Sequence, residues 1–231
     1  MKIDKSAPVI HGLDKTVTTW TNKAPVISVN ATDYLKDTTY VGSDLKQVVI
    51  KDYNGKVMAL GIDSCKFTLT DKYEGTRDFT IEATDNVGNV KTEKITTRYD
   101  NTKPVILGDE SSAVDNSVYV SNNNINQACN DYYTNSRYAN DSSGIKEVKL
   151  YAYKDGKLEE VKSNATRITF AFQNKDNNFT CRHKIKENEK DIEYFLLVVK
   201  DFSGNESTKK ITSQRYLLTT IRTSIDESSF N

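Results

Sequence analysis

The fold is decided by the stretch Ala83-Thr84-Asp85-Asn86-Val87-Gly88-Asn89, which returns in a second form as Lys200-Asp201-Phe202-Ser203-Gly204-Asn205. Both stretches contain the phrase Asp-x-x-Gly-Asn. Each lies between two runs rich in β-branched and aromatic residues, at 79–82 and 94–97 and at 195–199 and 209–212. Glycine in such a turn is free to adopt positive φ, so strand, turn and strand form a β-hairpin. Two hairpins of one kind predict two copies of one β domain.

The two copies also open alike. The first opens with Asp4-Lys5-Ser6-Ala7-Pro8-Val9-Ile10 and the second with Asp100-Asn101-Thr102-Lys103-Pro104-Val105-Ile106. Proline removes a ladder donor and stiffens the chain, which suits an edge strand or a joint between domains. The predicted domains are residues 1–99 and 100–213, followed at 214–231 by a linker or the start of a further element. A length of 231 residues agrees with two domains of about 100 residues each.

Short strands separated by turns fill the rest of each copy. Ile27, Val29 and Ala31 alternate with polar residues, which is the period of a half-buried strand. The dipeptides Asn54-Gly55 and Asp155-Gly156 predict hairpins between neighbouring strands. A further strand-like stretch lies in the second copy at 167–172. About seven strands per copy, without a helical period, predict an all-β chain of two tandem immunoglobulin-like β-sandwich domains.

Composition narrows the classes of partner. Lys and Arg number 32, as do Asp and Glu, so the net charge of zero disfavours nucleic acid. No apolar run approaches the ~20 residues needed to cross a bilayer, so membrane insertion is not expected. The start, Met1-Lys2-Ile3-Asp4, carries no signal peptide. Because it leads directly into a domain, we interpret the chain as a fragment of a longer protein.

These motifs resemble the bacterial immunoglobulin-like (Big-type) repeats of surface and secreted proteins of Gram-positive, clostridia-like bacteria. The resemblance covers roughly residues 3–212. The other motifs that show this resemblance are Trp20-Thr21-Asn22-Lys23, Ala31-Thr32-Asp33 and Ser143-Gly144-Ile145-Lys146-Glu147-Val148. It implies an extracellular or cell-surface location and a non-enzymatic role as a spacer or adhesion module beside neighbouring domains of the same polypeptide. The alternatives it implies are an accessory region of a secreted carbohydrate-active enzyme, binding glycan or protein, and a decoration on a phage virion.

Catalytic residues are not predicted. The only histidines, His11 and His183, fall on unrelated strands of different copies. A catalytic base needs a positioned partner, so surface or strand histidines are the favoured interpretation. No nucleophile, phosphate-loop or zinc motif is present. Paired carboxylates for glycoside cleavage remain open among the 32 acidic residues, although nothing in the sequence concentrates them.

Calcium is the cofactor that the sequence suggests. Acidic residues at strand ends and turns could gather around a hard cation: Asp33, Asp85, Asp131, Asp141 and Asp201. The favoured interpretation of Asp85 and Asp201 is structural, since an aspartate in a turn habitually accepts backbone N–H bonds there.

The three cysteines do not form a disulfide framework. Cys65 and Cys181 stand at matching places before their hairpins, and Cys129 lies on an earlier strand. A Cys129–Cys181 bridge is conceivable, but adjacent strands seldom provide good disulfide geometry. Buried free thiols are therefore the favoured interpretation.

A ligand surface is predicted in the second copy, where an Asn- and Tyr-rich stretch at 122–135 departs from the repeat pattern. Tyrosine and asparagine supply stacking area and adaptable hydrogen bonds, which suits glycan or host-protein recognition. The candidate residues are Tyr119, Tyr132, Tyr133, Asn135 and Tyr138. The competing interpretation is a solvated loop with one or two core tyrosines.

Overall fold

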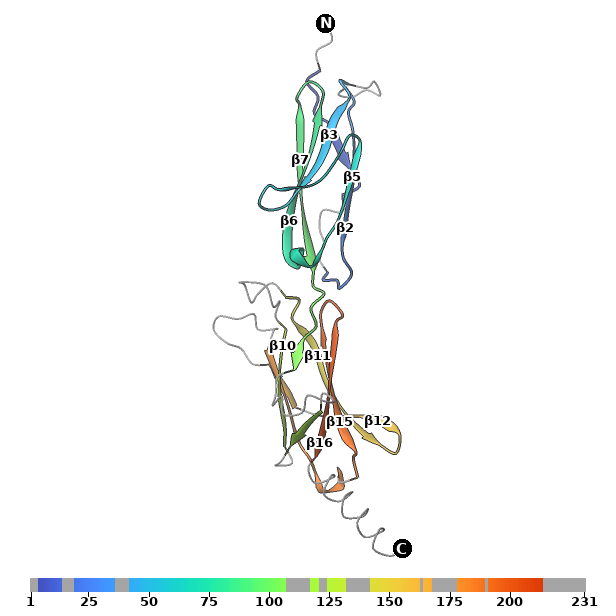
Figure 1. Ribbon diagram of the computed structural model, residues 1–231, viewed down its shortest axis with the longest axis vertical. Coiled ribbons are helices and arrows are strands. Elements are labelled where there is room, and N and C mark those ends of the chain that lie inside the picture. Colours follow the sequence, from blue (N-terminus) through green and yellow to red (C-terminus); the bar gives the residue numbers. More distant parts are fainter. Residues whose placement is uncertain are drawn as a thin grey trace, which may run out of the picture. The chain divides into compact units, whose positions relative to one another are not determined.

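The computed structural model (Figure 1) describes residues 4–13, 19–35, 42–106, 117–120, 124–131, 142–162, 164–167, 178–189 and 191–213. Within these ranges the regular elements are strands and two 3-10 turns, Asp71–Tyr73 and Glu187–Glu189, which confirms the all-β class. The described part of the chain holds no helix long and apolar enough to span a membrane. The chain divides into two compact units, Met1–Asn101 and Thr102–Asn231, whereas the predicted boundary lay between residues 99 and 100.

The first unit is a sandwich of a three-stranded and a four-stranded sheet (Figure 1). The first sheet has the order β1 (Val9–His11), β2 (Val26–Thr32) and β5 (Ser64–Thr68). The second has the order β4 (Val57–Gly61), β3 (Leu45–Lys51), β6 (Gly75–Asp85) and β7 (Val90–Tyr99). All strand pairs within both sheets are antiparallel.

Side-chain alternation builds the core of this unit. Along β2, Ile27, Val29 and Ala31 are buried while the residues between them are exposed, as the sequence predicts. From the opposing sheet, β6 contributes Phe79 and Ile81, both fully buried. Period-two strands place their apolar side chains on one face, and in this unit the apolar faces of the two sheets pack against each other to form the core.

The second unit repeats this plan with additional strands. One sheet has the order β13 (Asn164–Arg167), β14 (Asn178–Lys184), β10 (Asn124–Asn130) and β8 (Val105–Ile106). The other has the order β12 (Lys157–Val161), β11 (Ile145–Lys154), β15 (Tyr194–Asp201), β16 (Glu206–Ser213) and β9 (Ser117–Val120). Of the extra strand predicted at 167–172, Arg167 is the last residue of β13, and residues 168–172 lie outside the described residues.

The two units share a topology that the duplicated sequence predicts. In each, the first strand of the hairpin that carries the Asp-x-x-Gly-Asn turn (β6 of β6–β7, β15 of β15–β16) also pairs with an earlier strand of the same unit, β3 or β11. Strand β9 runs parallel to β16, and an isolated parallel bridge between Thr21 and Tyr99 stands at the same place in the first unit. These are two tandem immunoglobulin-like sandwiches. Residues 214–231 lie outside the described part.

Candidate metal centre

The Asp-x-x-Gly-Asn turn is held by its own aspartate. Asp85 Oδ1 accepts hydrogen bonds from the backbone N–H groups of Val87 (3.0 Å) and Asn89 (2.8 Å). Asp85 Oδ2 accepts one from Asn89 Nδ2 at 2.7 Å. Gly88 supplies the positive φ of 97° that the turn requires. Asp85 therefore makes the turn bonds that the structural interpretation assigned to it.

The second copy repeats the two contacts from the final asparagine and replaces the third by one from the glycine. Asp201 Oδ1 accepts hydrogen bonds from the backbone N–H groups of Gly204 (2.6 Å) and Asn205 (2.7 Å). Asp201 Oδ2 accepts one from Asn205 Nδ2, also at 2.7 Å. The asparagine that ends the phrase thus orients the aspartate that begins it, in both units.

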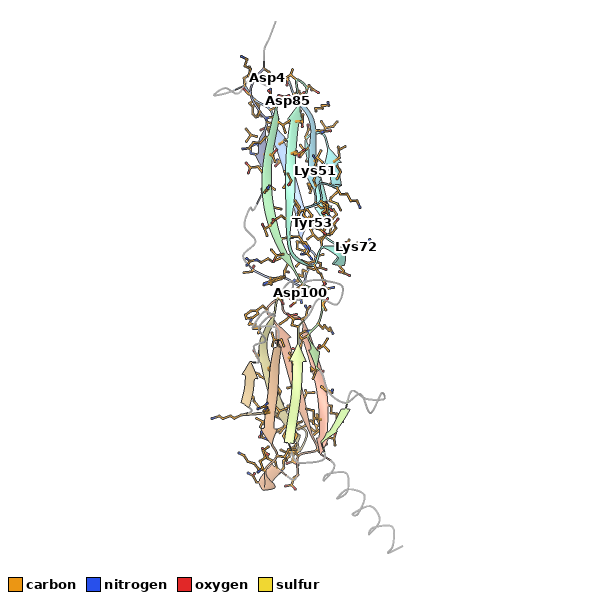
Figure 2. All side chains as sticks on the ribbon, turned by 90° about the vertical axis from the view of Figure 1, so that its left-hand side faces the viewer. Asp4, Lys51, Tyr53, Lys72, Asp85 and Asp100 are labelled. Carbon is orange, nitrogen blue, oxygen red and sulfur yellow. The ribbon has the colours of Figure 1, made fainter. Side chains whose placement is uncertain are left out.

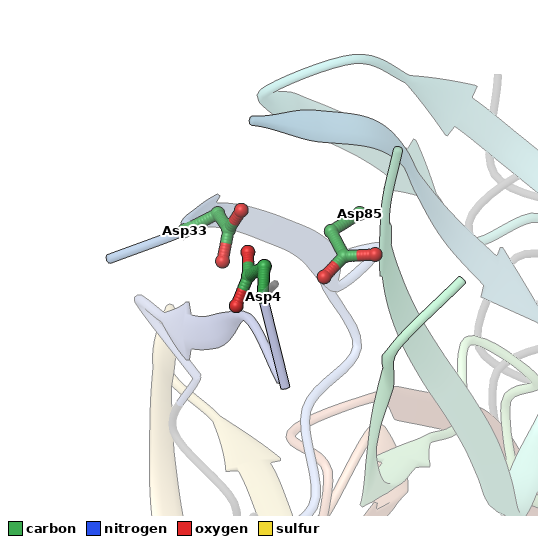
Figure 3. Close-up of side chains that lie close together, drawn as sticks. All are labelled: Asp4, Asp33 and Asp85. Carbon is green, nitrogen blue, oxygen red and sulfur yellow. The ribbon is translucent and has the colours of Figure 1, made fainter. Parts of the chain in front are cut away.

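Three aspartates of the first unit converge. Figure 2 shows two of them, Asp4 and Asp85, at the end where the chain enters. Asp4 lies in the segment before β1, Asp33 directly follows β2, and Asp85 ends β6. Each offers a carboxylate oxygen within 4.8 Å of the others, and Figure 3 shows the three side chains reaching toward one another. Asp85 and Asp33 are buried, with 0% and 5% exposure, and Asp4 is half-buried.

The carboxylate of Asp33 is the least satisfied of the three. Its Oδ1 has no hydrogen-bond partner among the described residues, and its Oδ2 accepts a long bond of 3.4 Å from Ser43 Oγ. Burial raises the pKa of Asp33, and the negative charges of Asp4 and Asp85 raise it further. Hydrogen bonds from the backbone of Asp44 and Ser43 lower this pKa, but they do not outweigh burial and the two charges.

Asp85 shows the opposite shift. Burial alone would raise the pKa of its carboxyl, but the hydrogen bonds from Asn89 and from the N–H groups of the turn outweigh burial and lower that pKa. The cluster therefore combines Asp85, whose charged carboxylate is stabilised by hydrogen bonds, with Asp33, whose charged carboxylate is destabilised by burial and by its acidic neighbours.

The loop over the cluster approaches it closely. A Cβ atom added at Gly42 would lie 2.5 Å from Asp4 Oδ2 and 2.7 Å from Asp33 Oδ2, so a side chain at this position would push these carboxylates from their places. The backbone N–H of Ser43 donates to Asp4 Oδ2 at 2.7 Å. This hydrogen bond ties the entering segment to the residues between β2 and β3.

In the second unit, Asp131 and Asp201 form a matching pair. Asp131 follows β10 and Asp201 ends β15, and their carboxylate oxygens lie within 4.8 Å of each other. Both residues are buried, and the backbone N–H of Gly144 donates to Asp131 Oδ2 at 2.6 Å.

The structure thus groups Asp33 with Asp85 and Asp131 with Asp201, all four named from the sequence, while Asp141 lies outside the described residues. Sequence reasoning did not name Asp4 as a ligand. The signal was available, because an aspartate stands four residues before the proline in both openings.

The predicted ligand surface lies almost wholly beyond what the structure describes. Tyr132, Tyr133, Asn135 and Tyr138 are outside the described residues, and Tyr119 is placed only by its backbone in β9, opposite Thr212.

A different aromatic group lies on β11 and β15. The rings of Tyr153 and Tyr194 stack with centroids 4.6 Å apart, and Lys210 Nζ lies 4.4 Å from the centroid of the Tyr194 ring. One face of Tyr194 is therefore covered by tyrosine, and the lysine ammonium lies over the ring as well.

The histidines contact side chains of their own units. His11 Nε2 lies 2.8 Å from Thr32 Oγ1 at the surface. His183 is buried, with Nε2 3.1 Å from Glu189 Oε2 and its ring against Phe195.

All three cysteines are buried and none of them forms a disulfide bond, which agrees with the buried thiols favoured from the sequence. Cys129 is opposite Phe179 and Cys181 opposite Gln127, so the two cysteines are diagonal rather than directly paired. Burial, followed by the neighbouring Cys181, raises the pKa of the Cys129 thiol to about 12.

No protein-family model and no curated protein matches the sequence. Among solved structures, the chain is similar to the fibronectin(III)-like modules of Clostridium thermocellum CbhA (12% identity, 89% of this chain and 93% of that chain, TM-score 0.33). It is also similar to three N-terminal domains of the bacteriophage RB49 outer capsid protein Hoc (10%, 90% and 69%, TM-score 0.45). A third similar structure is the insect immune protein hemolin (13%, 91% and 47%, TM-score 0.42). The fold assignment rests on the sheet topology described above.

Proposed function

We propose that the chain is a non-enzymatic tandem immunoglobulin-like region of an extracellular bacterial surface protein, where it acts as a spacer and adhesion module. The observation that carries this proposal is the duplication of a complete sandwich, down to the hydrogen bonds of the Asp85 and Asp201 turns. Each copy has its own hydrophobic core. Self-contained modules joined in series provide reach at low conformational entropy.

Force spectroscopy on the whole chain tests the spacer role. A tether of independently folded modules should unfold in two separate events, one for each core. A single event that releases the whole chain, or gradual extension without events, would contradict the proposal.

The adhesion part of the proposal needs a partner, and a glycan or a host surface protein is the class that the tyrosine- and asparagine-rich stretch favours. An array of glycans probed with the whole chain, together with a variant that carries Tyr132→Ala and Tyr133→Ala, addresses it. Binding that the double variant loses supports recognition through the asparagine- and tyrosine-rich stretch at 122–135. Binding that the variant keeps assigns recognition to another surface, and no binding leaves the spacer role alone.

A further inference from the structure

We propose that Asp4, Asp33 and Asp85 bind one calcium ion at the end of the first unit, independently of the role proposed above. Calcium takes oxygen ligands at about 2.3–2.6 Å, so two ligands on opposite sides of one ion are about 5 Å apart. The three carboxylate oxygens lie within 4.8 Å of one another, which matches this span. One ion can therefore contact all three carboxylates.

The side chain of Asp33 points to a ligand independently of this clustering. It is 95% buried, since only 5% is exposed, and its Oδ1 has no hydrogen-bond partner among the described residues. A buried carboxylate oxygen without a partner is costly, and here the charges that act on it most strongly, Asp4 and Asp85, are negative as well. A bound cation supplies the missing partner and offsets the repulsion.

Hydrogen bonds from neighbouring residues orient two of the three carboxylates. Asp85 is oriented by the turn bonds from Val87 and Asn89, and Asp4 is held by the N–H of Ser43. These bonds leave further lone pairs on the carboxylate oxygens, because each carboxylate has about four acceptor positions. Gly42 keeps the loop backbone close over Asp4 and Asp33 without placing a side chain between them.

The donor set selects the class of metal. The cluster consists of carboxylates alone, without the thiol or imidazole ligands that favour zinc and copper. Magnesium demands near-ideal octahedral geometry and keeps several waters, whereas calcium accepts flexible arrangements of carboxylates. Three acidic side chains from three separate segments fit calcium better.

The consequence is mechanical. Asp33 directly follows a strand of one sheet, Asp85 ends a strand of the other, and Asp4 belongs to the entering segment. An ion shared by all three fastens both sheets and the incoming chain at one point. Calcium should therefore slow hydrogen exchange of the Ser43 N–H, which donates to Asp4.

Calorimetry on the full chain tests the proposal, with scans in calcium chloride or in chelator at matched ionic strength. Calcium should raise the melting midpoint of the first unit by several degrees, because a ligand that binds only the native state stabilises it by mass action. Asp33→Asn should abolish this rise and lower the number of ions bound per chain by one in a titration. In chelator the variant should melt above wild type, because it removes a charge that opposes folding.

Asp63→Asn is the matched control. Asp63 is an exposed acid of the same unit outside the cluster, and its variant should keep the full calcium response. If Asp33→Asn fails to fold, Asp4→Asn in the half-buried entering segment provides the same test. No calcium-induced shift in wild type, an unchanged response in the Asp33 and Asp4 variants, or an equal response to magnesium would overturn the assignment.

Discussion

Asn89 and Asn205 show how single residues carry the repeated turn. Each donates its side-chain amide to the aspartate four residues earlier, at 2.7 Å in both units. Asn89 also reaches the backbone carbonyl of Asp4 at 3.4 Å, and Asn205 reaches that of Thr102 at 3.0 Å. The asparagine thus links the hairpin to the opening segment of its own copy, which explains why the phrase ends in this residue.

Replacing Asn89 by alanine should destabilise the first unit by about 1–3 kcal/mol at neutral pH, because it leaves a buried carboxylate short of a donor. Asp85 has a lowered pKa in the folded state, so its contribution is present above the ordinary carboxyl pKa of 3.8 and disappears as pH falls through the lowered value. The difference between wild type and variant should therefore shrink below about pH 4. Urea unfolding in chelator from pH 7 to pH 3 measures it.

Asn54→Ala serves as the control, since Asn54 is exposed in a different turn and should change the free energy of unfolding by less than about 0.5 kcal/mol. A wild-type-to-variant difference that stays constant across the pH range would contradict the role given to the Asn89–Asp85 bond.

The edge strand of the same sheet exposes apolar side chains in the first copy and charged side chains in the second. Strand β4 ends the four-stranded sheet of the first unit, and β12 ends the corresponding sheet of the second. Leu60 and the adjoining Ile62 are 64% and 65% exposed, whereas β12 presents the exposed Glu159 and Glu160. Charges on an edge strand discourage pairing with other chains. Of these two edge strands, β12 has such charges and β4 does not.

The centre and the edge of this sheet should respond differently to substitution. Phe79→Ala in β6 removes a fully buried ring and should cost about 3–5 kcal/mol. Leu60→Glu at the edge should change the free energy of unfolding by less than about 0.5 kcal/mol, because its side chain is already in water. Urea unfolding of both variants measures the contrast. A cost above 1 kcal/mol for Leu60→Glu would show that β4 is covered in solution.

For the whole molecule, the two hydrophobic cores share no residue. Phe79, Ile81 and their neighbours form one core, and Phe195, Leu197 and theirs form the other. Core packing stabilises only the residues that are in contact with one another, so each core stabilises its own unit. We therefore expect the two units to unfold separately.

Phe79→Ala should therefore lower hydrogen-exchange protection in the first unit alone, and Phe195→Ala in the second alone. Native-state exchange resolved by residue measures both variants on the full chain. Loss of protection in both units from either substitution would show that they unfold as one cooperative body.

The sequence by itself determined the all-β class, the duplication and the hairpins. These features depend on neighbours along the chain: the period-two burial of Ile27, Val29 and Ala31, and the positive φ available to Gly88 and Gly204. Such features can be predicted from the sequence because the residues that determine them are neighbours in the chain.

Only the tertiary structure decided which side chains meet. Asp4, Asp33 and Asp85 come from an entering segment and from strands of two sheets, and nothing in their spacing states that they converge. The stacking of Tyr153 on Tyr194 likewise depends on the register of β11 against β15. Register and sheet packing arise from contacts distant in the chain, so a site assembled from three segments exists only once both sheets have closed over the core.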